Sequence, residues 1–318
     1  MTTRRSLMLG ALAAPLLARP ALAAFPDKPV TLIMPYAPGT IAGAYARVLA
    51  EHMQKETGQP CVVTHRDGGS GTVGMRALAQ APGDGHTIAI TPLTPVVVMP
   101  YLVRNLGISP DSFAPVCGIT ENILGIVVKA DSPVRGVAEL VAAGRRRNLS
   151  FGSPGPNSLP QIGTWRITRA TGVEFTHIPF RGDAAPVTET IAGRLDFAAI
   201  VVSSATPQIE AREVRLIGVF SARRHPDYPD VPTMAEQGID ATQLSYAGMF
   251  ASRGTPDATL GALERLTTQG MATPAFQAIA QRGRVVVAPL ERRAFTALVA
   301  GEYAAFGPIL RQLGVEPE

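Results

Sequence analysis

The sequence is poor in aromatic, charged and cysteine residues. Aromatic residues make up 6% and charged residues 17% of its 318 residues, and it has two cysteines and one tryptophan. With 31 glycines and 28 prolines, this composition favours many short turns and argues against a coiled coil or a long helical array. No apolar run approaches the roughly 20 residues that span a bilayer, so we do not expect stable membrane insertion. A hydrophobic content of 46% suffices for one large domain or two smaller ones.

Signatures of hydrolases and metal enzymes are also missing. The sequence has neither a G-x-S-x-G elbow nor an H-E-x-x-H pair, and its five histidines are scattered singly. Cys61 and Cys117 have no histidine at ligand spacing. Both lie in apolar runs typical of buried free thiols, with a disulfide as the alternative. His177 ends a predicted strand, where a structural role suits it best. We expect no catalytic residue, no metal site and no cofactor.

The basic charge of the chain is concentrated at its beginning. Residues 1–23 contain Arg4, Arg5 and Arg19 and no acid, and the rest of the chain has 26 basic and 25 acidic residues. This near balance argues against a nucleic-acid partner. The arginines, an apolar stretch and a small-residue cleavage motif are typical of an export signal over residues 1–23. Arg4 and Arg5 also fit the twin-arginine pattern, with an ordinary secretion signal as the alternative. Either route predicts a periplasmic protein.

Apolar strand-like runs alternate with helical patterns through short loops, which predicts parallel βαβ units and an α/β fold. The predicted strands lie at 30–34, 60–65, 87–91, 150–152, 173–177 and 197–201. Apolar extended segments at 124–129 and 246–251 bracket the second series, and the tail from residue 259 is mostly helical. We therefore expect two lobes joined by two extended crossings, formed by residues 24–125 plus 249–318 and by residues 126–248.

A glycine-rich loop follows the second predicted strand. Residues 69–74 match G-x-G-x-x-G, a pattern in which backbone amides at a helix start hold a pyrophosphate. The motif follows the second strand rather than the first, and no acid that could bind a ribose occurs between Asp84 and Asp111. A tight glycine turn explains the pattern better. An exported dinucleotide-dependent oxidoreductase is kept as an alternative function.

Several loops that follow predicted strands carry glycine together with hydroxyl or amide side chains. These loops contain Gly39-Thr40, Gly71-Thr72, Thr91 to Thr94, Gly155 to Ser158 and Ser203-Ser204. In open parallel sheets, ligands bind beyond the carboxyl ends of the strands, where helix N-termini favour an anion. Neutral donors around a cleft between two lobes therefore predict a receptor that captures a small carboxylate without reacting with it.

Many short segments, in their order and spacing, carry a family resemblance. They are residues 25–30 (FPDKPV), 35–39 (PYAPG), 66–74 (RDGGSGTVG), 81–87 (APGDGHT), 113–116 (FAPV), 152–155 (GSPG), 177–182 (HIPFRG), 229–238 (PDVPTMAEQG) and 250–256 (FASRGTP). In these segments the chain resembles the Bug-type, TctC-like receptors of tripartite tricarboxylate transporters. The resemblance implies a type II periplasmic binding protein fold, with a ligand cleft between two α/β lobes. It also implies a non-enzymatic monomer that captures an organic acid for a membrane permease.

The resemblance further implies that hydroxyl and backbone groups of two loops hold the ligand carboxylate. One wall of the cleft would consist of Tyr36, Pro38, Gly39, Thr40 and Ile41, with Thr72, Thr91 and Thr94 nearby. The opposite wall would consist of Ser153, Asn157, Ser158 and Gln161, with Phe180, Arg181 and Gly182 at its edge.

Two positions depart from the family pattern. Gly43 stands where an acid is usual, and Ile200 stands where an acid is common after the strand that begins at residue 197. A buried acid would pair with an amino group, so the loss of both acids disfavours an amino-bearing or strongly hydroxylated ligand. Together with the bulk of Ile41, it predicts a carboxylate with an apolar or aromatic body. A ligand-sensing receptor for a sensor kinase would need the same cleft and is a second alternative.

Overall fold

The first strand and helix show how the chain builds its α/β units. The apolar run Val30–Met34 forms the buried strand β1. Helix α1 (Ile41–Thr57) begins at Thr40, whose hydroxyl accepts the N–H of Gly43 at 3.1 Å, a common N-terminal cap. It ends at Gly58, which takes the left-handed conformation with φ 71°, as glycine readily does. The expected strand therefore forms, and a helix with a glycine stop follows it.

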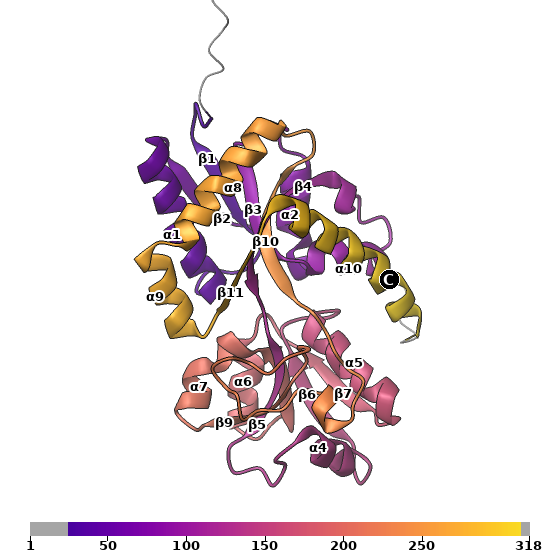
Figure 1. Cartoon of the computed structure of the whole chain (residues 1–318). Helices are drawn as coiled ribbons and strands as arrows, with labels where there is room; N and C mark the ends of the chain where they lie inside the picture. The colour runs from indigo at the N-terminus through magenta and orange to yellow at the C-terminus, as the bar shows by residue number, and fades with distance from the viewer. Residues whose placement is uncertain (1–24, 313–318) are drawn as a thin grey trace, which may run out of the picture.

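The computed structural model describes residues 25–312, which form two lobes placed one above the other (Figure 1). The export signal expected at residues 1–23 lies outside the described residues. Lobe 1 contains β1, α1, β2 (Cys61–His65), α2 (Thr72–Ala79), β3 (Thr87–Pro92), α3 (Met99–Leu102), β4 (Phe113–Glu121), β10 (Tyr246–Ser252), α8 (Asp257–Met271), α9 (Pro274–Gly283), β11 (Val286–Leu290) and α10 (Arg292–Gln312). Lobe 2 contains β5 (Leu124–Lys129), α4 (Val137–Gly144), β6 (Leu149–Ser153), α5 (Leu159–Thr171), β7 (Phe175–Pro179), α6 (Ala184–Ile191), β8 (Phe197–Val201), α7 (Thr206–Glu210) and β9 (Val214–Val219).

Each lobe has one mixed sheet. In lobe 1 the strand order is β11-β4-β10-β3-β1-β2, and in lobe 2 it is β7-β6-β8-β5-β9. β1 pairs in parallel with β2 and β3, and β6 pairs in parallel with β7 and β8. The strands next to the crossings, β10 in lobe 1 and β5 in lobe 2, are antiparallel to their neighbours. The parallel strands of each lobe therefore end at one common edge.

The two crossings between the lobes run side by side. β4 ends at Glu121 and β5 begins at Leu124, while the return crossing leads into β10 at Tyr246. The N–H of Asn122 donates to the carbonyl of Ser245 at 2.7 Å, which joins the two crossings directly. The sheet pairing shows that the chain passes from one lobe to the other at residues 122–123 and 244–245. Both points lie a few residues before the expected boundaries.

Two strands, β9 and β11, were not predicted from the sequence pattern, and β4 was expected only as a short apolar run around Cys117. β4 contains Pro115 and is flanked by β10 and β11, with register shifts on both sides. β11 lies within the tail that was expected to be mostly helical. Its pairing with β4 adds an edge strand to lobe 1 and carries the chain from α9 to α10.

The largest apolar cluster runs through both lobes. In lobe 1 it includes Phe250 and Phe295, whose ring centroids lie 5.3 Å apart, and in lobe 2 it includes the stacked pair Phe151 and Phe197 at 5.2 Å. All four side chains are completely or almost completely buried, and each contributes roughly 1.5–3 kcal/mol by leaving water. Because the cluster is continuous, the two lobes share part of their apolar core.

Both cysteines are buried free thiols, as expected. Burial raises the pKa of Cys61 to about 11 and that of Cys117 to about 12. A thiolate is the reactive form of cysteine, so neither side chain is an active nucleophile at neutral pH.

Gly74 is required for the close approach of α2 to the end of β1. A Cβ at this position would lie 2.6 Å from the Cβ of Pro35 and 2.9 Å from its Cα. We expect Gly74→Ala to lower the free energy of unfolding by about 1–3 kcal/mol through overpacking, measured by urea denaturation. Gly261→Ala in α8 is the control, because a Cβ there meets nothing within 4 Å and should stabilise the helix by up to about 1 kcal/mol. Unchanged stability of Gly74→Ala would contradict this role.

Candidate functional site

Loops of both lobes meet where the two sheets present the carboxyl ends of their parallel strands. The lobes are in contact there, because the hydroxyl of Ser70, after β2, donates to the carbonyl of Pro156, after β6, at 3.1 Å. A Cβ on Gly155 would also lie 3.6 Å from the Ser70 hydroxyl oxygen. We call this region the interlobe site, formed by the loops 35–41, 68–72 and 91–94 of lobe 1 and the loops 153–158, 180–183 and 201–204 of lobe 2.

Tyr36 is held at a fixed place in the wall of lobe 1. Its phenol donates to the carbonyl of Ser70 at 3.3 Å, and its own carbonyl lies 2.9 Å from Nδ1 of His65. Burial raises the pKa of Tyr36 well above its ordinary value, the Thr91 hydroxyl offsets part of this rise, and the charge of Asp183 in lobe 2 adds to it. Tyr36 is therefore a neutral hydrogen-bonding group at physiological pH, and it faces Asp183 across the site.

The wall of lobe 2 is organised around the buried hydroxyl of Ser153. This hydroxyl donates to the carbonyl of Gly155 at 3.0 Å, accepts from the hydroxyl of Ser158 at 3.1 Å and lies 2.8 Å from Nε2 of His177. Burial lowers the pKa of His177 to about 4, so its ring is neutral. Because one hydroxyl has one proton to donate, the three contacts are satisfied together when His177 carries its proton on Nε2. Ser153 then has no capacity left for a further partner.

Helix α5 begins beside this cluster without a side-chain cap. Its N-cap residue is Ser158, which donates its hydroxyl to Ser153 and makes no cap bond to the helix. The preceding residue Asn157 takes the left-handed conformation with φ 59°, and its N–H donates to Oε1 of Gln161 at 2.6 Å. The N–H groups of the first turn of α5 are therefore not satisfied by a capping side chain, and the positive end of the helix dipole favours an anion there.

Asp183 is the residue of the interlobe site that sequence reasoning missed. It precedes α6, and its carboxylate accepts the N–H of Val201 at 3.1 Å and the hydroxyl of Ser204 at 3.3 Å. Burial raises the pKa of Asp183 to about 6, although both hydrogen bonds act in the opposite direction. Its position directly after the Phe180–Gly182 turn was the only available signal, and a lone acid in a loop is too common to be singled out.

The predicted site residues of lobe 1 differ in how far they are buried and in where their side chains point. Tyr36, Thr72, Thr91 and Thr94 are buried or partly buried, whereas Pro38, Gly39 and Thr40 are exposed in the loop before α1. The side chain of Ile41 is directed toward α9, because a Cβ on Gly283 would lie 2.7 Å from its Cδ1.

The predicted residues of lobe 2 lie close together. Ser153, Ser158 and Gln161 are buried, and Asn157 and Phe180 are partly buried. The N–H of Phe180 donates to the carbonyl of Ser153 at 2.9 Å, which joins the two loops of this wall. Arg181 and Gly182 are exposed at its edge.

The two positions that depart from the family pattern lie in different surroundings. Gly43 is buried, and a Cβ there would lie 3.4 Å from Cε1 of His65. Ile200 is completely buried in the apolar core of lobe 2 with Val127 and Val202. Ile200 therefore packs inside lobe 2. The absence of an acid at this position does not by itself tell how polar the interlobe site is.

Comparisons with known proteins agree on one family. Residues 45–315 match the tripartite tricarboxylate transporter family receptor, TctC. The chain belongs to this receptor family. A UPF0065 protein of Pseudomonas sp. strain P51 is 35% identical over 267 residues, covering 82% of this chain and 80% of that protein. A structure from R. palustris with adipate is 26% identical with a TM-score of 0.84, covering 92% of this chain and all of the other. The protein MatC of Rhodopseudomonas palustris, solved with bound malate, is 25% identical with a TM-score of 0.80, covering 90% of this chain and all of the other.

Family membership confirms the two-lobe fold and excludes the enzymatic alternative. The family consists of periplasmic solute-binding receptors for transport, not enzymes. The alternative of a dinucleotide-dependent oxidoreductase is therefore wrong. The glycines of residues 69–74 serve packing and contact instead: Gly74 adjoins Pro35, and the Ser70 hydroxyl meets lobe 2. Within residues 25–312, no helix has the length and apolarity to cross a membrane, and no cluster of metal-binding side chains is present.

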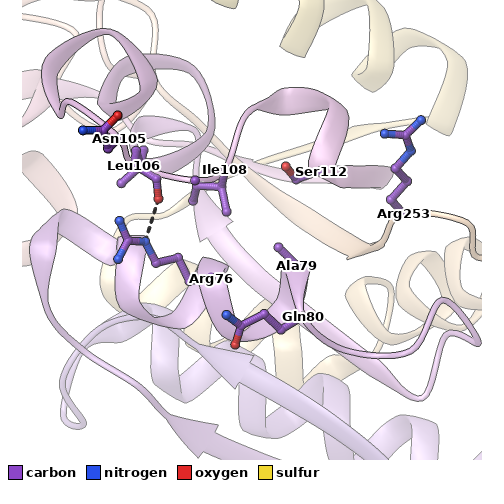
Figure 2. A pocket seen from close by; sticks show the side chains of 9 residues that line it. Arg76, Ala79, Gln80, Asn105, Leu106, Ile108, Ser112 and Arg253 are labelled. Carbon is purple, nitrogen blue, oxygen red and sulfur yellow. Dashed lines mark hydrogen bonds between the residues drawn. The ribbon is translucent and has the colours of Figure 1, made fainter.

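A recess of about 510 Å³ lies on lobe 1 of this receptor, away from the interlobe site. Figure 2 shows that it is bordered by Arg76 of α2, by Gln80 directly after α2 and by Arg253 after β10. Arg76 is held by its Nε, which donates to the carbonyl of Leu106 at 2.7 Å. Because α2 starts at the interlobe site and this recess adjoins its other end, the two places do not form one site.

A second contact between the lobes lies at the end of α9, above α7 in Figure 1. Arg284 of lobe 1 pairs with Glu210 at 3.1 Å and with Asp227 at 3.3 Å, both in lobe 2. The hydroxyl of Thr206, in α7, donates to the carbonyl of Gly283 at 3.3 Å. These bonds join the lobes without passing through the interlobe site.

We expect Arg284→Glu to open the ligand-free receptor, because it replaces an attraction across the lobes with repulsion from two acids. Small-angle scattering should give a larger radius of gyration, with an unchanged circular dichroism spectrum. The matched control is Arg292→Glu, since Arg292 pairs with Asp257 at 2.7 Å inside lobe 1. An equal radius of gyration for Arg284→Glu and wild type would show that this contact does not hold the lobes together.

Asp183 should lower stability at neutral pH. Its pKa of about 6 in the folded protein lies above the value of about 3.9 for an unfolded chain. The folded state therefore binds more protons between these values, and stability falls as pH rises through them. Asp183→Asn lacks this titration, so its free energy of unfolding should rise relative to that of wild type as pH increases from 4 to 7.5. We expect this relative rise to be about 1–3 kcal/mol, measured by urea denaturation at both pH values. A difference that is independent of pH would contradict the raised pKa.

Proposed function

We propose that this receptor captures a small organic carboxylate in the interlobe site and delivers it to the permease of a tripartite tricarboxylate transporter. The observation that carries the proposal is the start of α5, where no side chain caps the helix and the positive end of its dipole faces the site. Around it lie uncharged groups of Ser158, Asn157 and Tyr36, which donate within the protein here and would turn to the ligand on binding. Such groups bind an anion and offer no means of converting it.

The solved relatives support the size and class of the ligand. One was solved with adipate and another with malate, which are short dicarboxylates. By analogy we infer that this chain takes a carboxylate of similar size. Shape alone carries no such argument, because one fold serves many ligands.

We further infer that the body of the ligand is largely apolar. The partly buried ring of Phe180 lies against the wall of lobe 2, where a Cβ on Gly152 would be 3.0 Å from its Cε2. Pro38 lies in the loop before α1 on the opposite side. An aliphatic or aromatic body would remove the Phe180 ring from water, at roughly 25 cal/mol per Å² of apolar surface buried.

The proposal also covers how the receptor works in the cell. We expect a monomer that is exported through residues 1–23 by the twin-arginine route, binds its ligand and docks on the permease. Two lobes joined by neighbouring crossings suit hinge closure around a ligand, and exclusion of water strengthens the polar contacts inside.

The proposal predicts binding of short carboxylates and its loss on a single substitution. Calorimetry with adipate, malate, succinate and 3-phenylpropionate should detect at least one complex, and the bound acid should raise thermal stability. Ser158→Ala should weaken that binding by about 1–3 kcal/mol, because it removes a hydroxyl from the start of α5 and leaves Ser153 short of a partner.

Thr296→Ala is the matched control, since it removes an exposed hydroxyl of α10 that donates only to Arg292 within its own helix. It should leave the dissociation constant unchanged. The proposal is overturned when none of the four acids binds, or when mass spectrometry detects conversion of a bound acid.

A further inference from the structure

Asp183 lies in the wall that lobe 2 contributes to the interlobe site. It faces Tyr36 of lobe 1 closely enough for its charge to raise the pKa of that phenol. Tyr36 in turn bonds to Ser70, and Ser70 bonds to Pro156 of lobe 2. The turn that presents Asp183 is fixed by two backbone bonds, from Phe180 to Ser153 and from Gly182 to Pro154. The carboxylate thus belongs to the wall of the interlobe site.

No cation of the described chain neutralises this carboxylate. Its partners within residues 25–312 are the N–H of Val201 and the hydroxyl of Ser204, both uncharged. Arg181, two residues earlier, is exposed and makes no ion pair with it. Asp183 is partly buried, and burial of an ionised carboxylate without a positive partner is costly, so such groups concentrate at binding and catalytic sites.

The two hydrogen bonds of Asp183 do not by themselves explain an acid. An asparagine or a serine could also accept a bond from Val201 or Ser204, and neither would bring a charge into the site. The acid becomes useful when a ligand supplies a donor, because hydrogen bonds with an ionised partner are about twice as strong as neutral ones.

We propose that Asp183 selects ligands that carry a hydrogen-bond donor, a hydroxyl or an ammonium group, in addition to their carboxylate. The carboxylate would lie at the start of α5, and the donor would reach Asp183 beside Tyr36. This inference rests on the proposed function and limits it: the body of the ligand is apolar except for one donor. It departs from the expectation, drawn from Gly43 and Ile200, that an amino-bearing ligand is disfavoured.

Two matched series of acids test the inference. Succinate, malate and aspartate differ only in carrying hydrogen, hydroxyl or ammonium on one carbon, as do 3-phenylpropionate, 3-phenyllactate and phenylalanine. With the wild-type receptor at pH 7.5, calorimetry should show a hydroxyl- or ammonium-bearing acid binding at least about tenfold more tightly than its unsubstituted analogue. The two donor-bearing acids of each series identify which donor Asp183 prefers.

Substitution of Asp183 should abolish this preference. In Asp183→Ala the acids of a series should bind within about twofold of one another, and Asp183→Asn, which keeps the shape of the side chain, should lose most of the preference. Asp230→Ala, which removes an exposed acid elsewhere in lobe 2, should retain the wild-type preference. Circular dichroism checks that each variant is folded.

The outcomes separate this inference from the proposed function. Tighter binding of the unsubstituted acids, or a donor preference that survives in Asp183→Ala, overturns the role of Asp183 while leaving carboxylate capture in place. When neither these six acids nor adipate binds to wild type, carboxylate capture itself is overturned, and the inference with it.

Discussion

The pairing of the two chain crossings is the constraint on which the rest of the structure depends. The bond from Asn122 to Ser245 and the antiparallel ladder of β4 with β10 keep the crossings together. Each crossing leads into a sheet whose parallel strands end at one edge, and the bond from Ser70 to Pro156 shows that loops of the two edges meet. The loops that carry polar groups therefore lie between the lobes. Hinge motion at the two crossings can bring these loops closer together.

The interlobe site combines a region suited to an anion with a single acid. On the side of α5, buried hydroxyls satisfy one another and leave the helix start uncapped. On the side of α6, the carboxylate of Asp183 lies at the helix start and accepts hydrogen bonds from uncharged groups of Val201 and Ser204. A ligand that is negative at one end and donates at the other matches this arrangement, whereas a ligand with two anionic ends must place one of them near Asp183.

Much of the fold could be predicted, because β1, α1 and their repeats follow simple patterns of apolar residues and glycine stops. β11 could not, since its five residues carry no clear alternation and it forms through pairing with β4. In the site, hydroxyl-rich loops could be recognised, but not how their bonds are distributed. The sequence does not show that Ser153 has three partners, or that the side chain of Ile41 is directed to Gly283, because both depend on residues distant in the chain.

The acid of the interlobe site shows why polarity has to be judged in space rather than by position in a motif. Ile200 replaces an acid in the pattern, but its side chain packs inside lobe 2. Asp183 comes from another element and bonds to Val201, the residue directly after Ile200, so it brings a carboxylate to the same stretch of chain. Its raised pKa shows that this carboxylate is held at a cost in stability. Proteins keep such costs mainly where function requires them, which agrees with the proposed role of Asp183 in recognising a donor on the ligand.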